Sequence, residues 1–290
     1  LLLPRPAAYS DMCLNPYTRR KTSIPTEFSS RLNMPHIIMN ALRWKDLIIR
    51  SVCFFLLGAV TASFPATAQA WNAFNVQYLY GSNYELEPEQ VDILTLEWAN
   101  GWTYGDNFVF VDITNFVQGD NTVYAEWSPR LSLSKITGKD FSIGPIQDVL
   151  LSGTVELGVG ISNYLIGGAI DLGIPSFNFF QVNGYLRENS ELSGSTWQVT
   201  LVWSADFEIG RARWNFSGFI DWAGSEGKPG TPAYSKRNFH AQPQLLLDLG
   251  HFLDQSGWLY AGVEWLYWDN RFGIPGITES VTQAMVKAKF

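Results

Sequence analysis

Cysteine is almost absent from this chain, and its scarcity excludes two kinds of small protein. Of the 290 residues only Cys13 and Cys53 are cysteines, so the 237 positions after Cys53 contain none. That stretch can hold neither a disulfide framework nor a thiolate zinc module. Charged residues are also sparse, at 16% of the chain, whereas aromatic residues reach 15%, a balance that indicates apolar surroundings.

Positive charge is in deficit too. Residues 71–290 contain 24 Asp and Glu against 12 Lys and Arg, which gives this part of the chain a net charge of −12. A protein that binds a nucleic acid polymer needs a basic surface, so we expect no such partner. The same residues lack an apolar run of the roughly 20 residues that a membrane-spanning helix requires.

The segment 39–70 has the three parts of a secretory signal peptide. A basic start over 43–50 is followed by an apolar core over 52–60, and 68–70 has the small-x-small form of a cleavage site. We predict that this signal is cut before Trp71. A single membrane anchor is the alternative, which the short apolar core disfavours.

The remaining chain divides at this predicted signal. Residues 1–38 carry scattered prolines and no periodicity, and we interpret them as an upstream extension that is not part of the functional protein. The functional part is then 71–290. Period-2 alternation recurs there, as in 109–113 and 196–206, where an apolar face opposes a face with polar groups. The sequence therefore predicts an all-β protein.

Turn residues separate about twelve candidate strands: 72–82, 91–100, 106–117, 122–135, 146–158, 162–173, 177–188, 196–208, 213–223, 238–250, 257–269 and 280–290. An even number of strands near ten residues each is typical of a transmembrane antiparallel β-barrel of the bacterial outer membrane. A periplasmic amino terminus would put the longer connections outside, among them 83–90, 189–195, 224–237 and 270–279. The periplasmic turns should be shorter, with 136–145 and 251–256 as exceptions.

A soluble sandwich or lipocalin-like barrel is the alternative for this pattern, and the acids argue against it. A soluble barrel should be apolar inside. Acidic residues here share the face opposite the apolar one: Asp112, Glu156, Asp206, Asp221, Asp248 and Glu264. Because burying so many carboxylates in a dry core is very costly, we expect these acids to face a wet lumen.

The last strand and the tryptophans point to the outer membrane of a Gram-negative bacterium. Phe290 ends an alternating strand, which resembles the signal read by the outer-membrane barrel assembly machinery. Six tryptophans near strand ends would contact lipid and lipopolysaccharide as interfacial girdles: Trp71, Trp98, Trp102, Trp127, Trp222 and Trp258. We expect a monomer.

Two segments carry a family resemblance. The stretch "EWSPRLSLSKITGKDFSIGPIQD" (126–148) is similar to the Glu-x-x-Pro-Arg strand, Lys-Leu-Thr turn and Ser-x-Gly-Pro of the nucleoside-specific, Tsx-like outer-membrane channels. Ile136 replaces the Leu, and Ser128 replaces a usual Glu before Pro. The stretch 108–119 matches the family at Phe108, Phe110, Asp112, Phe116 and Gly119. We predict that the first segment is a strand ending at Lys135, then a turn that Lys135 and Asp140 bridge.

The resemblance implies passive nucleoside uptake, so the lumen should offer aromatic faces for the base and hydrogen-bonding groups for the ribose. Alternation selects the candidate substrate-binding residues: Phe108, Phe110, Asp112, Phe116, Glu126, Arg130, Tyr185, Arg187, Asp206, Asp221, Tyr260, Glu264 and Trp268, with Phe219 as a further stacking candidate. The alternative is a general or other small-solute porin on the same barrel.

A barrel enzyme or a plugged structural barrel is the less favoured class. The predicted functional part has two histidines, His240 and His251, and neither is accompanied by a serine nucleophile motif. We interpret His240 as a structural or lumen histidine. Since no phosphate-binding loop, calcium loop or metal-ligand motif is present, we expect no catalysis, no cofactor and no metal.

Overall fold

The computed structural model describes residues 71–86 and 88–290. The upstream extension predicted over 1–38 and the signal predicted over 39–70 lie outside the described residues. In the part that is described, no helix is long and apolar enough to cross a membrane.

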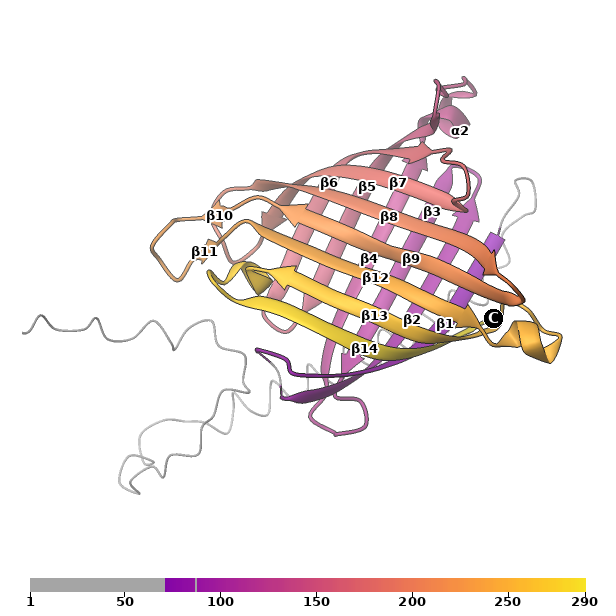
Figure 1. The fold of residues 1–290 in the computed structure, drawn as a ribbon. Coiled ribbons are helices and arrows are strands. Elements are labelled where there is room, and N and C mark those ends of the chain that lie inside the picture. Colours follow the sequence, from indigo (N-terminus) through magenta and orange to yellow (C-terminus); the bar gives the residue numbers. More distant parts are fainter. Residues whose placement is uncertain (1–70, 87) are drawn as a thin grey trace, which may run out of the picture. The chain divides into compact units, whose positions relative to one another are not determined.

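Twelve strands form a closed antiparallel barrel (Figure 1), so the predicted strand number is confirmed. Their bounds are β1 Trp71–Ser82, β2 Gln90–Trp102, β3 Gly105–Thr114, β4 Thr122–Ser132, β5 Ile146–Gly158, β6 Ile161–Leu172, β7 Phe179–Asn189, β8 Thr196–Ile209, β9 Ala212–Ala223, β12 Asn238–Asp248, β13 Leu259–Asp269 and β14 Thr278–Lys289. A separate two-stranded hairpin consists of β10 (Glu226–Gly227) and β11 (Tyr234–Ser235).

The first and last strands close the ring. β1 and β14 pair from Asn75 with Lys289 to Tyr80 with Ala284. Beyond this register, the backbones of Phe74 and Phe290 exchange two hydrogen bonds, and their rings lie 6.0 Å apart. Closure leaves no free sheet edge, which is the condition for a β-sheet to stand in lipid.

Side chains alternate between two faces along each strand, and in β14 one face is buried and the other exposed. Glu279, Val281, Gln283, Met285 and Lys287 are buried, and the residues between them are exposed. The buried face is the inner one, because its side chains bond across an intervening strand, which only a concave surface allows. Arg130 of β4 reaches Asp171 of β6, and Arg187 of β7 reaches Glu156 of β5.

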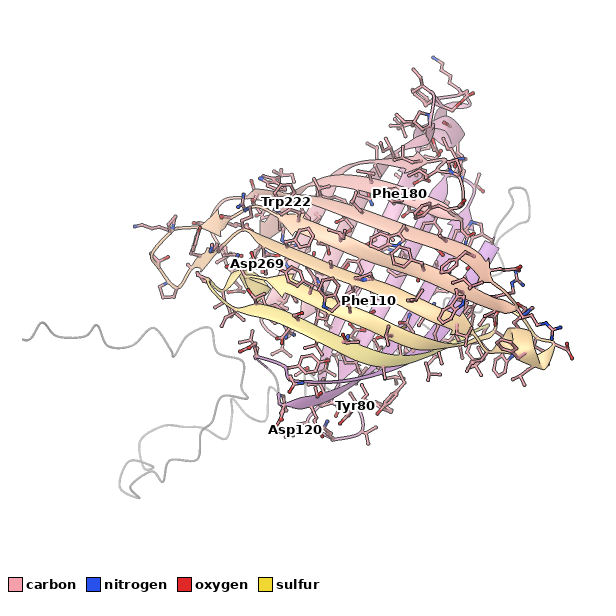
Figure 2. All side chains as sticks on the ribbon, viewed as in Figure 1. Tyr80, Phe110, Asp120, Phe180, Trp222 and Asp269 are labelled. Carbon is pink, nitrogen blue, oxygen red and sulfur yellow. The ribbon has the colours of Figure 1, made fainter. Side chains whose placement is uncertain are left out.

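The outer face is apolar and rich in aromatic side chains. Tyr80 and Trp222 project from it (Figure 2), and large exposed residues include Leu151, Leu157 and Trp265. Five of the six tryptophans predicted as girdle residues are exposed, all except Trp98. An apolar outer surface on a closed barrel is what a bilayer requires.

The connections define two rims. The terminal rim carries both ends of the barrel chain and the connections 103–104, 133–145, 173–178, 210–211 and 249–258. The opposite rim, which we call the loop rim, carries 83–89, 115–121, 159–160, 190–195, 224–237 and 270–277. Short 3₁₀ helices lie in one connection of each rim: η1 (Gly250–Leu253) and η2 (Arg271–Gly273).

The predicted strand end at Lys135 is wrong. The strand stops at Ser132, whose hydroxyl caps the short helix α2 (Leu133–Thr137) by accepting from the Lys135 backbone N–H at 3.0 Å. Gly138 then ends the helix in the left-handed region, at φ 69°. The carboxylate of Asp140 accepts from the Ser142 N–H rather than bridging to Lys135, and this bond holds the pKa of Asp140 below its usual value.

An apolar cluster occupies one side of the lumen. Leu246, Tyr260, Met285 and Leu79 are buried together, with Ile93 packed against them. They come from β12, β13, β14, β1 and β2, five neighbouring strands of the ring. The lumen is therefore not uniformly polar.

Candidate functional site

Twelve of the thirteen predicted site residues lie on the inner face of the barrel, according to the strand alternation and pairing. Phe116 is the exception. It lies in the β3–β4 connection and is 45% exposed, because the strand ends at Thr114 rather than near residue 117. Phe219 is on the inner face of β9.

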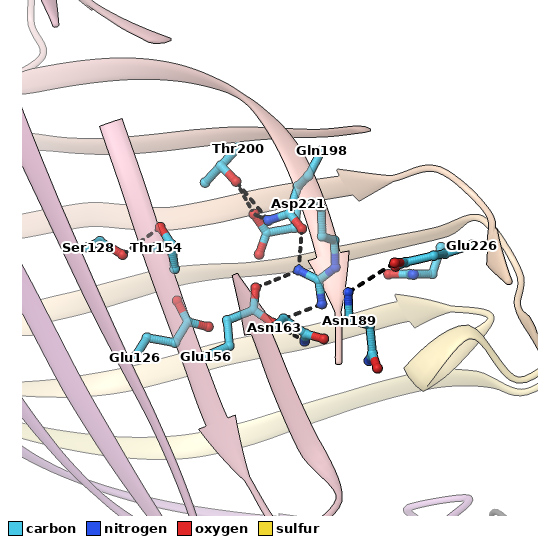
Figure 3. A network of polar contacts seen from close by, with 12 residues as sticks. Glu126, Ser128, Thr154, Glu156, Asn163, Asn189, Gln198, Thr200, Asp221 and Glu226 are labelled. Carbon is cyan, nitrogen blue, oxygen red and sulfur yellow. Dashed lines mark hydrogen bonds and ion pairs between the residues drawn. The ribbon is translucent and has the colours of Figure 1, made fainter. Parts of the chain in front are cut away.

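The first inner network links β5, β7, β8 and β9 near the loop rim (Figure 3). Arg187 places Nη1 and Nη2 on the two carboxylate oxygens of Glu156, at 2.5 and 2.8 Å, and Nη1 also donates to Gln198 Oε1 at 2.6 Å. Gln198 Nε2 and Thr200 Oγ1 both donate to Asp221 Oδ1, at 3.1 and 2.5 Å. Two predicted residues, Arg187 and Asp221, thus belong to one chain of hydrogen bonds.

Glu126 stands beside this network. It is the direct cross-strand partner of Glu156. Its carboxylate accepts from the Tyr124 hydroxyl. On the other side of Glu156, Asn163 Nδ2 donates to Oε2.

A second network crosses from β12 to β2. Glu264 accepts from Gln244 Nε2 at 2.7 Å and from Gln283 Nε2 at 2.8 Å. Lys287 Nζ donates to Gln244 Oε1 at 3.0 Å and lies 4.0 Å from Glu97. Asp112, on the neighbouring β3, accepts from Thr95 Oγ1 at 2.5 Å.

Arg130 forms the third network, nearer the terminal rim. Its guanidinium binds Asp106 through Nε and Nη2, at 2.8 and 2.7 Å, and Asp171 through Nη1 at 2.6 Å. The sequence predicted its inward direction but not these two partners. Ser128, two residues away on the inner face, pairs its hydroxyl with that of Thr154 at 3.0 Å.

Two other predicted residues make smaller inner contacts. The Tyr185 hydroxyl lies 2.8 Å from Ser152 Oγ. Asp206, toward the terminal rim, accepts from Asn215 Nδ2 at 2.7 Å and Asn178 Nδ2 at 2.9 Å. Tyr260, predicted as a stacking residue, instead packs in the apolar cluster with Lys289 Nζ 4.5 Å from its ring centroid.

Aromatic side chains form two groups on opposite walls. On β3 and β4, Phe110 lies between Phe108 and Tyr124, with ring centroids 6.0 and 5.8 Å apart; we call these three the aromatic ladder. On β9, β12 and β13, a second group consists of Phe219, His240 and Trp268. β3 and β9 are six places apart in the ring of twelve strands, so the two groups belong to opposite walls of the barrel.

Stacking orders the second group. His240 lies flat on Trp268 with 4.0 Å between ring centroids, and Phe219 meets His240 edge-on at 5.1 Å. Phe272, from the inward-turned connection 270–277, packs on Trp268 at 4.6 Å. The interpretation of His240 as a lumen histidine agrees with this position.

The neutral amides and Phe272 were not among the residues predicted from the sequence. Gln198, Gln244 and Gln283 hold the carboxylates, and they occupy inner positions of the same alternation that selected the acids. Polar uncharged residues at those positions were therefore a usable signal. Nothing in the local pattern of 270–277 indicated that Phe272 turns back onto a barrel residue.

The inner face can recognise an uncharged solute that has a flat ring and hydroxyl groups. Aromatic faces stack on rings, and carboxylates and amides hydrogen-bond to hydroxyls. Across 71–86 and 88–290, no group of three or more His, Cys, Asp and Glu side chains is placed to hold a metal ion.

Comparison with known proteins places this chain among outer-membrane channels. A model of the family described as nucleoside-specific channel-forming protein, Tsx, matches residues 66–241. Outer membrane protein OmpK of Vibrio parahaemolyticus is 26% identical over 168 residues, which cover 52% of this chain and 63% of that protein. The chain thus spans less than two thirds of the curated relative's length.

Solved structures give weaker matches. The KdgM porin aligns with a TM-score of 0.45 and 7% identity over 75% of this chain and 99% of its own. The Acinetobacter baumannii outer membrane protein Omp33 aligns with a TM-score of 0.34 and 12% identity over 75% of this chain and 96% of its own.

Proposed function

This chain belongs to the family of nucleoside-specific channel-forming proteins, Tsx, and from that premise we propose that its lumen admits nucleosides. The family supports an outer-membrane channel for small solutes rather than an enzyme. Our proposal adds to this that the solute is a nucleoside, which diffuses passively down its concentration gradient.

The observation that carries the proposal is the pair of aromatic groups on opposite walls with hydrogen-bonding networks beside them. A nucleoside has a flat base and a hydroxyl-bearing sugar and carries no net charge. The aromatic ladder and the group around Trp268 offer faces to the base. Carboxylates such as Glu126 and Asp221 offer acceptors to the sugar hydroxyls. Stacking on an aromatic face is worth about 1–3 kcal/mol per base. This is enough to favour nucleosides over solutes without a ring, yet too little to hold a nucleoside in the channel.

The rest of the cell-surface setting is also part of the proposal. We propose that the loop rim faces the exterior and that Phe290 presents the last strand to the assembly machinery. We further propose that the apolar outer face contacts lipid and lipopolysaccharide. We also propose that the protein is a monomer. The longest connection, 224–237, lies at the loop rim and supports this orientation, whereas 133–145 and 249–258 at the terminal rim contain the two exceptions named from the sequence.

The test is single-channel conductance of the refolded protein in a planar bilayer while adenosine or thymidine is titrated. We expect saturable current block by nucleosides and none by sugars or amino acids of similar size. Phe110→Ala should raise the half-blocking concentration by about tenfold, the loss of one stacking face. Val109→Ala, the neighbouring outward position, is the matched control and should leave the block unchanged.

A general small-solute porin is the second candidate, and Ser128 favours it. The family pattern has a carboxylate where Ser128 stands, and here that inner position is filled by a hydroxyl paired with Thr154. An open channel whose current ignores nucleosides would select this candidate and leave the barrel itself unaffected.

A further inference from the structure

Three carboxylates meet near the loop rim, and we call them the acidic belt: Glu126, Glu156 and Asp221. Glu126 and Glu156 are direct cross-strand partners, a position in which like charges repel. Asp221 comes from β9, five places around the ring from the strand of Glu126. Figure 3 shows the three carboxylates within one close view of the lumen.

One guanidinium group, that of Arg187, forms an ion pair with the acidic belt. Arg187 binds Glu156 through both terminal nitrogens, so its charge is matched to a single carboxylate. The other two carboxylates accept hydrogen bonds from neutral groups: Glu126 from Tyr124, and Asp221 from Thr200 and Gln198. Neutral donors stabilise a carboxylate without cancelling its charge, so the belt keeps an excess of about two negative charges at a pH where all three are ionised.

An unpartnered acceptor points to what the belt attracts. Asn163 is 3% exposed and donates Nδ2 to Glu156, yet its Oδ1 has no donor among the described residues. In Figure 3 Asn163 lies within the network, next to Glu156. A buried carbonyl without a donor is costly. Beside carboxylates, a small cation or its hydration water supplies the missing partner.

The excess of acid continues along the lumen. In the second network two cations of β14, Lys287 and Lys289, stand against three carboxylates, Glu97, Glu264 and the neighbouring Asp112. In the third network Arg130 is shared by two carboxylates, Asp106 and Asp171. In each of the three networks, acidic side chains therefore outnumber basic ones.

We infer that the lumen conducts small inorganic cations in preference to anions, and that the acidic belt sets this preference. Acidic side chains around a pore concentrate counter-ions and repel ions of their own sign. The inference requires an open channel and no particular organic solute. It can therefore hold or fail independently of the nucleoside proposal.

The test is the zero-current potential of the refolded protein in a planar bilayer with a tenfold KCl gradient at pH 8, without any nucleoside. We expect a zero-current potential with the same sign as the K⁺ equilibrium potential, which indicates a K⁺-selective pore. Glu126→Gln and Asp221→Asn keep an oxygen that accepts from Tyr124 and Thr200, so the fold is retained. Each should lower the permeability ratio of K⁺ to Cl⁻ by about fivefold or more, because one unit charge about 4 Å away in water is worth about fivefold for each ion, in opposite directions.

The matched control is Asp140→Asn, which removes one carboxylate from the exposed segment after α2. We expect this variant to keep the wild-type potential. A wild-type potential near zero or of the anion-selective sign would overturn the inference. So would belt variants that shift the potential no more than Asp140→Asn does.

Discussion

Arg187 holds one carboxylate, that of Glu156, and one amide, that of Gln198, in place on the inner wall. Its ion pair with Glu156 is largely buried, with side-chain exposures of 18% and 8%. Removing one member of such a pair leaves an uncompensated charge, which costs about 3 kcal/mol or more. We expect Arg187→Met to lower the free energy of unfolding by about that amount in urea titrations of the refolded barrel.

The control for this prediction is the double variant Arg187→Met with Glu156→Gln. Because it removes both charges, it should recover a large part of the lost free energy of unfolding. If the double variant is no more stable than Arg187→Met alone, the ion pair is not the cause of the loss.

Glu226 gives a pH-dependent prediction at the loop rim. Burial in the β10–β11 hairpin raises the pKa of Glu226 above its usual value, although its carboxylate accepts from the Asn189 N–H. A raised pKa in the packed state means that packing is most favourable at low pH and weakens as pH rises through that pKa. Because glutamine does not titrate, packing of the hairpin in Glu226→Gln should not depend on pH in this way.

Hydrogen exchange of residues 224–237 in the two proteins, compared at the same pH, measures this effect. We expect wild type to exchange faster than Glu226→Gln at pH 7 and at an equal rate near pH 4. Faster exchange of the variant at pH 7 would show that the carboxylate bond to Asn189 outweighs the burial.

The direction of a side chain could be predicted from the sequence, whereas its partners could not. A charge on the lipid face is costly, so alternation alone placed Asp112, Asp221 and Glu264 inward. Partners across the lumen depend on how far each strand is shifted along its neighbour. That register joins residues such as Arg130 and Asp171, 41 positions apart, and no local pattern encodes it.

At the scale of elements, β9 and β12 approach closely where a glycine faces a proline. Gly218 pairs with Pro243, which has no N–H to donate to the ladder. Gly218 has φ 152°, and a Cβ there would lie 2.4 Å from Gln242 O. On the other side of Gly218, its partner on β8 is Trp203. Trp203 is buried although it lies on the outer face, and its ring centroid lies 5.7 Å from that of Phe216.

We therefore expect Gly218→Ala to separate β9 from β12 and to lower the free energy of unfolding by about 2 kcal/mol. Gly184→Ala on β7 is the matched control, because a Cβ there meets nothing within 4 Å. Urea unfolding followed by tryptophan fluorescence reports both variants. Equal stability of the two would show that the strands relax around the added methyl group.

The twelve strands could be predicted because each repeats the same alternation, but the small elements in the connections could not. The alternation of 122–135 continues past Ser132, where capping by its hydroxyl starts α2 instead. The β10–β11 hairpin has two residues in each strand and pairs at two positions. Elements this short are set by contacts with the barrel rather than by their own sequence.

At the scale of the whole molecule, the first described residue of the barrel, Trp71, is the residue that the sequence predicts to follow the cleavage site. β1 starts at Trp71, which pairs with Gly101. We expect the exported protein to begin with Trp71-Asn72-Ala73, as measured by intact mass and amino-terminal sequencing. A mature chain that starts later would lack part of β1 and would contradict both the cleavage site and this strand pairing.

The apolar cluster has an electrical consequence. Leu246 is fully buried and Met285 is 2% exposed, although both lie on the inner face of the barrel. Side chains that water cannot touch carry no current, so this sector of the cross-section is insulating. At the height of this cluster, ions and solutes can use only the part of the cross-section that the cluster leaves free. The barrel should consequently have a higher resistance than its circumference of twelve strands implies.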